Sequence, residues 1–129
     1  MSSTNYQRNL VNDFNFGGIS YTPPVSYFLG LSIGSGSSPT EPVGGGYARV
    51  QINNTKANFS YSSSGCLVLS TSASFVQSSG SWGTVTDLVL FDAITSGSPR
   101  YYTALPTPIT VQTNTTLSFS ASAITFSQS

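Results

Sequence analysis

Apolar and polar side chains alternate with a period of two through most of the chain after residue 19. Over residues 27–33, for example, Tyr27, Leu29, Leu31 and Ile33 occupy one phase of the alternation. A period of two places such side chains on one face of an extended strand. Similar segments, separated by loops rich in Gly, Pro, Ser and Asn, predict further strands at residues 47–52, 65–70, 73–76, 85–91, 100–104, 109–111 and 117–126.

The segment 85–91 is apolar in both phases of the alternation. Val89 and Phe91 lie in one phase, and Leu88 and Leu90 lie in the other. A strand of this kind is covered on both faces. The pattern therefore predicts a position in the protein core or at an interface between copies, with Leu88 and Leu90 as candidate interface residues.

The alternation changes phase near the end of the chain. Leu117 and Phe119 begin a regular apolar phase, but Ile124 and Phe126 are apolar in the other phase. Side chains on a regular strand cannot change face without an extra residue or a break. We therefore expect a β-bulge or a sharp bend near residues 123–124.

Residues 4–16 show the one helical pattern. Thr4 is a suitable N-cap, and Tyr6, Leu10 and Phe14 recur every four residues to form an apolar stripe. The pair of glycines at 17–18 can end the helix, because glycine adopts the left-handed conformation.

Together these elements predict an all-β fold in a single domain. About eight short antiparallel strands, spaced roughly every ten residues, are typical of a β-sandwich, a jelly roll or a small barrel. The 129 residues suffice for one hydrophobic core. We expect a helical segment over residues 1–20 and a β-sandwich domain over residues 21–129.

The charge content excludes several classes of protein. Only 6% of the residues are charged, and the formal net charge is zero. The four basic residues are scattered, so no cluster can neutralise nucleic-acid phosphates. With no His and one Cys, the chain lacks the usual zinc ligands and the usual general base of nucleophilic catalysis. No apolar run approaches the length of a membrane span. We therefore expect no nucleic acid, membrane, metal or cofactor as a partner, and no enzymatic activity.

The acidic residues support the same conclusion. Asp13 lies in the expected helix, Glu41 lies in a loop, and Asp87 and Asp92 lie on or next to one strand with side chains on opposite faces. A glycosidase needs two carboxylates that face one glycosidic bond. A neutral surface rich in Ser and Thr instead favours association with other proteins.

The aromatic residues leave two interpretations open. Trp82 and Tyr101 are candidates for a surface that stacks against sugar rings, because amphipathic rings suit both apolar faces and hydroxyl groups. Tyr and Trp are also common in protein cores and at subunit interfaces.

Several short motifs together resemble a family of short virion proteins of tailed phages, whose members are often labelled tail fibre proteins. The motifs are GGISYTPP at 17–24, YFLGLS at 27–32, EP at 41–42, GGGYARV at 44–50, GSWGTVT at 80–86, LFDA at 90–93 and TLSF at 116–119. The resemblance implies a structural protein of the virion, made in the host cytoplasm. It supplies no catalytic residues.

Two hypotheses for the place of the protein in the virion follow. The small size and the absence of sequence repeats favour a capsid decoration (cement) protein on the capsid exterior, which would bind the major capsid protein and associate with itself, by analogy as a trimer. In this hypothesis the N-terminal segment acts as a clamp, and the candidate interface residues are Tyr6, Leu10, Phe14, Leu88 and Leu90. The alternative is a tail-fibre or baseplate-associated module that binds a host surface glycan through Trp82 or Tyr101.

Overall fold

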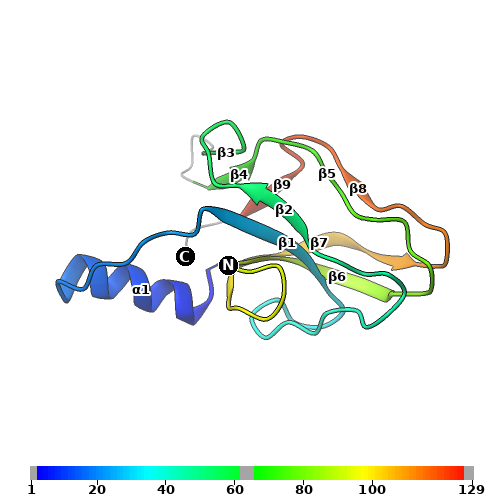
Figure 1. Cartoon of the computed structure of the whole chain (residues 1–129), viewed down its shortest axis with the longest axis horizontal. Coiled ribbons are helices and arrows are strands. Elements are labelled where there is room, and N and C mark those ends of the chain that lie inside the picture. The colour runs from blue at the N-terminus through cyan, green and yellow to red at the C-terminus, as the bar shows by residue number, and fades with distance from the viewer. Residues whose placement is uncertain (1–2, 62–65, 127–129) are drawn as a thin grey trace.

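The computed structural model describes residues 3–61 and 66–126, which form one helix and two layers of short strands (Figure 1). The elements are α1 (Asn5–Phe16), β1 (Ser26–Ser32), β2 (Val50–Asn53), β3 (Phe59–Tyr61), β4 (Leu67–Leu69), β5 (Ala73–Ser74), β6 (Gly83–Phe91), β7 (Pro99–Val111), β8 (Ser118–Phe119) and β9 (Ile124–Phe126).

The strands form three antiparallel sheets. The largest has the order β2-β1-β6-β7, and two smaller sheets, β3-β4-β9 and β5-β8, pack over it. The expected all-β fold with one short helix is confirmed, and within the described residues no sheet closes into a barrel. The sequence pattern does not predict strand β3. The expected strand at residues 65–70 contains β4, and its first residue, Gly65, lies outside the described residues.

The core lies between the large sheet and the two smaller ones. Antiparallel register places Leu29 opposite Leu90 and Leu31 opposite Leu88, and all four side chains are buried. They pack with apolar residues of the second layer, including Ile124. Because Leu88 and Leu90 are 1% and 0% exposed within a single chain, they belong to the core. Their assignment to an interface between copies is therefore corrected.

The opposite face of β6 is also covered, as the apolar pattern of residues 85–91 predicts. Val89 and Phe91 are buried on that face. The Arg49 guanidinium carbon lies 3.5 Å from the centre of the Phe91 ring. Arg49 belongs to the long connection between β1 and β2, so this connection covers the outer face of the sheet.

Helix α1 begins and ends as its sequence predicts. The Thr4 hydroxyl oxygen accepts a hydrogen bond from the Gln7 backbone N–H at 3.2 Å, which caps the first turn. At the other end, the Gly17 N–H donates to the Asp13 carbonyl, and Gly18 has a φ of +65°. The chain then turns back toward β1, and α1 projects away from both layers of strands (Figure 1).

The end of the chain contains the expected sharp bend. A turn between Ser120 and Ala123, with Ser122 at a φ of +65°, separates β8 from β9. The two strands belong to different sheets. The change of phase in the sequence therefore marks the point where the chain passes from one sheet to another.

Strand β7 runs through two prolines that separate two of the expected strands. It pairs with β6 from Pro99 to Ala104 and again from Ile109 to Val111, and the pairing is interrupted over residues 105–108. Pro106 and Pro108 lack a backbone N–H, so neither can donate to β6. The predicted break is thus an interruption in pairing within one continuous strand.

Candidate interaction surfaces

The segment from residue 3 to residue 25, here called the N-terminal arm, is anchored to the start of β7. The Thr4 backbone N–H donates to the Arg100 carbonyl at 2.9 Å, and the Thr4 hydroxyl donates to the Pro99 carbonyl at 2.7 Å. Ser3 forms a β-bridge with Tyr101. The arm therefore begins as a short addition to the edge of the large sheet.

A buried charged group secures the first turn of α1. The Arg100 guanidinium pairs with the Asp92 carboxylate at 3.0 Å and donates to the Gln7 side-chain oxygen at 2.8 Å. Arg100 and Gln7 are 6% and 3% exposed. Because Arg100 is held by Asp92 from one side, its guanidinium presents fixed donors to Gln7 on the other.

The rest of the arm exposes large apolar side chains. Phe16 is 87% exposed, Phe14 is 55% exposed and Tyr6 is 47% exposed. The exposed set also includes Val11, Ile19 and Val25. Leu10 is half-buried, and Phe14 makes an edge-to-face contact with Tyr21 at 6.1 Å between ring centres. Of the five candidate interface residues, the structure therefore places Tyr6 and Phe14 at the surface of the arm.

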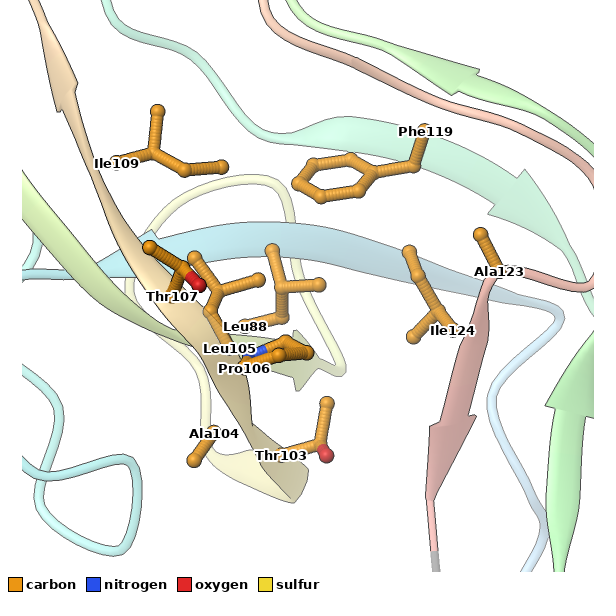
Figure 2. Close-up of a pocket in the computed structure, with 10 residues that line it drawn as sticks. All are labelled: Leu88, Thr103, Ala104, Leu105, Pro106, Thr107, Ile109, Phe119, Ala123 and Ile124. Carbon is orange, nitrogen blue, oxygen red and sulfur yellow. The ribbon is translucent and has the colours of Figure 1, made fainter.

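A second apolar surface lies beside β7. We call it the β7 groove, and Figure 2 shows the side chains that line it. Its volume is about 470 Å³, and it is lined by Leu88, Thr103, Ala104, Leu105, Pro106, Thr107, Ile109, Phe119, Ala123 and Ile124. None of these residues is charged. Leu88 and Ile124 belong to the core, so the groove opens directly onto the interior of the sandwich.

The interrupted pairing of β7 explains where the groove lies. Between Ala104 and Ile109 the strand has four residues, whereas β6 has one between Asp87 and Val85. This bulge falls where β7 faces Phe119 of the second layer, across the groove. The two prolines of an otherwise alternating segment are the sequence signal for this site, but their spacing does not reveal a groove.

A third cluster joins the β1–β2 connection to the loop after β6. Tyr47 donates to Glu41 at 2.6 Å and accepts from the Leu31 backbone N–H at 2.9 Å, where β2 no longer pairs with β1. Arg49 forms an ion pair with Glu41 and donates to the carbonyls of Ala93 and Ser96. The polar side chains of Glu41, Tyr47 and Arg49 are therefore engaged with one another and with backbone groups of the neighbouring segments.

Protonation in this cluster follows from its contacts. Burial by itself raises the pKa of the Glu41 carboxyl, but hydrogen bonds from Arg49 and Tyr47 and the charge of Arg49 together hold that pKa below its usual value of 4.5. Burial, followed by the hydrogen bond to Glu41, raises the pKa of Tyr47 well above its usual value. Both groups therefore keep one protonation state near neutral pH and hold the loops together.

The two candidate sugar-stacking residues lie in different environments. Trp82 is 3% exposed, and its indole N–H donates to the Gly45 carbonyl at 2.8 Å. It packs edge-to-face against Tyr47. Trp82 therefore offers no ring face to a ligand, and its assignment to a stacking surface is corrected. Tyr101 is half-buried and packs against the core from β7.

The acidic residues remain separate in the structure. Asp87 accepts a hydrogen bond from the Gly36 N–H, and Asp92 and Glu41 are engaged in separate ion pairs. The described part of the chain contains no group of three potential metal ligands. Over residues 3–61 and 66–126, no helix is both long and apolar enough to span a bilayer.

Comparison with known proteins gives one family. Residues 2–127 match the family described as Podophage GP4 fiber I protein gp80. A comparison with curated proteins gives no match. The family match confirms the resemblance to phage proteins of the tail-fibre type, which the motifs between residues 17 and 119 indicate. The chain therefore belongs to the Podophage GP4 fiber I protein gp80 family of virion structural proteins.

Proposed function

We propose that this chain is a tail-fibre component of the virion that binds other virion proteins through its N-terminal arm. One observation carries the proposal. The arm is held at its start by buried contacts of Thr4 and Gln7, while Phe14 and Phe16 at its far end are exposed. A helix of twelve residues has marginal stability in water unless its apolar face is packed.

The arm has the properties of an interaction surface. Exposed apolar surfaces larger than those of ordinary monomers mark sites of contact with proteins or membranes. Six large apolar residues of the arm are exposed, over between 37% and 87% of their surface. The function is assembly without catalysis, which the separate, already engaged carboxylates of Glu41 and Asp92 support.

The fibre family favours a place in the tail over the capsid exterior. A tail component is present in a few copies per particle, whereas a capsid decoration protein is present in hundreds. We expect quantitative mass spectrometry of purified particles to give a small ratio of this chain to the major shell protein, and antibody labelling to mark the tail. Hundreds of copies on the shell would overturn the tail proposal and support capsid decoration.

The role of the arm is tested by incorporation into particles. The variant Phe14→Ser/Phe16→Ser removes the two most exposed rings of α1 without altering its anchoring residues. A matched control, Asn12→Ser/Asn15→Ser, changes two exposed polar residues of the same helix. We expect the first variant to be lost from purified particles and the control to be retained. Equal incorporation of both variants would contradict the proposal.

The proposal does not assign glycan binding to a residue. Trp82 cannot carry it, because its ring is buried against Tyr47 and Gly45. Binding of a host glycan remains a prediction from the sequence.

A further inference from the structure

The turn between β6 and β7, over residues 92–98, connects two polar clusters of the protein. The cluster around Glu41 and Arg49 contacts the middle of this turn. The cluster around Arg100 and Gln7 contacts its first residue, Asp92. In Figure 1 the turn is drawn in yellow, beside the start of the arm. The long β1–β2 connection and the N-terminal arm are therefore both bonded to the ends of one short segment or to the segment itself.

Arg49 holds the middle of the turn. Its guanidinium donates to the Ala93 carbonyl at 2.6 Å and to the Ser96 carbonyl at 2.8 Å. The same guanidinium is paired with Glu41 and lies over the Phe91 ring, and the side chain is 6% exposed. Hydrogen bonds from a charged donor are stronger than those between neutral groups. A guanidinium fixed on the sheet in this way fixes the shape of the turn.

Asp92 joins the turn to the anchor of the arm. One carboxylate oxygen accepts from the Ser98 N–H at 2.7 Å, and the other accepts from Arg100 Nε at 3.1 Å. The groups that hold Gln7 and Thr4 belong to Arg100 and to the residue before it. The position of the arm therefore depends on the Asp92 carboxylate, whose position depends on the turn.

The turn has an unfavourable conformation and room to change it. Ser96 has a φ of +54°, in the left-handed region that is uncommon for residues other than glycine. A cavity of about 430 Å³ lies between the turn and the β1–β2 connection, lined by Ile94, Thr95 and Ser96 on the side of the turn. Such a conformation persists only where surrounding contacts impose it. We therefore expect the turn to relax when the bonds from Arg49 are removed.

We propose that Arg49 positions the N-terminal arm through the β6–β7 turn. Arg49 fixes the turn, the turn fixes the Asp92 carboxylate, and Asp92 holds the Arg100 guanidinium against the arm. Arg49 and Asp92 are thus positioning residues for a surface that they do not form. The inference rests on the proposed function, because it names the residues that keep the interaction surface of the arm in place.

Hydrogen exchange of the full chain, followed residue by residue by NMR, tests the proposal. The Thr4 N–H donates to the Arg100 carbonyl, so its exchange rate reports on the attachment of the arm, and the amides of β6 report on the fold. Arg49→Met keeps a long apolar side chain and loses every donor. The matched control is Lys56→Met, which removes a cation that lies over the Tyr61 ring.

We expect the Thr4 N–H to exchange about tenfold faster in Arg49→Met, because a hydrogen bond to a charged group contributes enough free energy for a change of this size. The amides of β6 should stay protected, and the Thr4 N–H should exchange at its original rate in Lys56→Met. Unchanged Thr4 exchange in a folded Arg49→Met chain would overturn the proposal. Equal acceleration in Lys56→Met would overturn it as well.

A second pair of variants disturbs the turn without removing a charge. Gly97 and Gly44 have φ values of +69° and +75°, so alanine causes similar backbone strain at both positions. A Cβ at Gly97 would overlap the Asp92 carboxylate, whereas a Cβ at Gly44 has no neighbour within 4 Å. We expect faster Thr4 exchange in Gly97→Ala and not in Gly44→Ala. The same rate in both variants would contradict the role of Asp92.

A double variant tests whether Arg49 acts through the anchor. In a Gln7→Ala background, Arg49→Met should accelerate Thr4 exchange by a smaller factor, because part of the contact that it weakens is already lost. An equal factor in both backgrounds would show that the effect of Arg49 bypasses the bond between Arg100 and Gln7, and would overturn the proposal.

Failure of this inference is distinguishable from failure of the proposed function. Loss of Phe14→Ser/Phe16→Ser from particles, with unchanged Thr4 exchange in Arg49→Met, would retain the function of the arm and overturn its positioning by Arg49. Faster Thr4 exchange in Arg49→Met, with full incorporation of Phe14→Ser/Phe16→Ser, would support the positioning and overturn the proposed function.

Discussion

The side-chain oxygen of Gln7 accepts a 2.8 Å hydrogen bond from the guanidinium of Arg100, across 93 positions of sequence. Arg100 is simultaneously paired with Asp92. A polar residue on the helix is thereby buried, while the aromatic residues further along α1 stay exposed. Directional polar contacts hold the start of the arm, and hydrogen bonds from Asn54 to Pro24 and Val25 hold its return to β1, while the aromatic residues of α1 between them stay exposed.

Replacement of Gln7 should loosen the arm and leave the sandwich folded. Gln7→Ala leaves a buried guanidinium donor without its acceptor, which costs about 1–3 kcal/mol. Asn9→Ala, at an exposed position of the same helix, controls for the higher helix propensity of alanine. We expect limited proteolysis to cleave within the arm faster in Gln7→Ala than in Asn9→Ala, with similar cleavage in the strands. Equal cleavage of the two variants would show that Gln7 does not anchor the arm.

Two adjacent glycines should respond differently to the same substitution. Gly44 and Gly45 have φ values of +75° and +60°, so alanine at either position is strained. A Cβ at Gly44 has no neighbour within 4 Å, whereas a Cβ at Gly45 would lie 2.8 Å from the Trp82 ring. We expect Gly44→Ala to cost about 1 kcal/mol and Gly45→Ala a further 1–3 kcal/mol or so in urea unfolding. A similar loss in both would contradict the close packing of Gly45 on Trp82.

Trp82 should affect stability rather than ligand binding. Trp82→Ala removes a buried ring and should lower the free energy of unfolding by about 3–5 kcal/mol. Trp82→Phe keeps an aromatic ring but leaves the Gly45 carbonyl without the indole N–H, so a smaller loss is expected. Chemical denaturation measures both values. A Trp82→Ala variant of unchanged stability would show that the indole is not part of the core.

The Glu41 cluster should weaken in acid. The pKa of Glu41 in the folded chain lies below its usual value of 4.5, so its ion pair with Arg49 stabilises the fold fully above about pH 4.5. This contribution should be lost as the pH falls through the folded pKa, because the unfolded state then binds the proton more readily. Glu41→Gln lacks the titrating carboxyl. We expect the difference in Tm between the unmodified chain and Glu41→Gln to shrink steadily below pH 4.5, and a constant difference would exclude this role.

The local pattern of the chain predicts its elements because local spacing controls which face a side chain occupies. The Thr4 cap, the stripe of α1 and the glycines at 17–18 define the helix, and the alternation over residues 27–33 and 85–91 defines two central strands. The change of phase before Ile124 locates the bend between sheets. Strand β3 escapes this reasoning, because Phe59–Tyr61 is too short to show a period.

The candidate surfaces are less accessible to sequence reasoning. The stripe of Tyr6, Leu10 and Phe14 indicates an apolar helix face, but the same stripe would suit a buried helix. Its exposure depends on where Gln7 meets Arg100, a contact between residues that are distant in sequence. Leu88 and Leu90 illustrate the converse case, since an apolar strand can serve a core or an interface, and their 1% and 0% exposure assigns them to the core.

By itself, the sequence determined the all-β class, the short helix that Thr4 caps, the bend near residues 123–124 and, through its motifs, the phage family. Each of these properties depends on residues that are close together in the sequence or on short sequence motifs. Only the tertiary structure decided that Trp82 is buried, that the arm is exposed and that the β7 groove opens onto the core. The physical reason is that burial depends on which distant segments pack together, and a period of two or of 3.6 residues specifies a face without specifying what covers it.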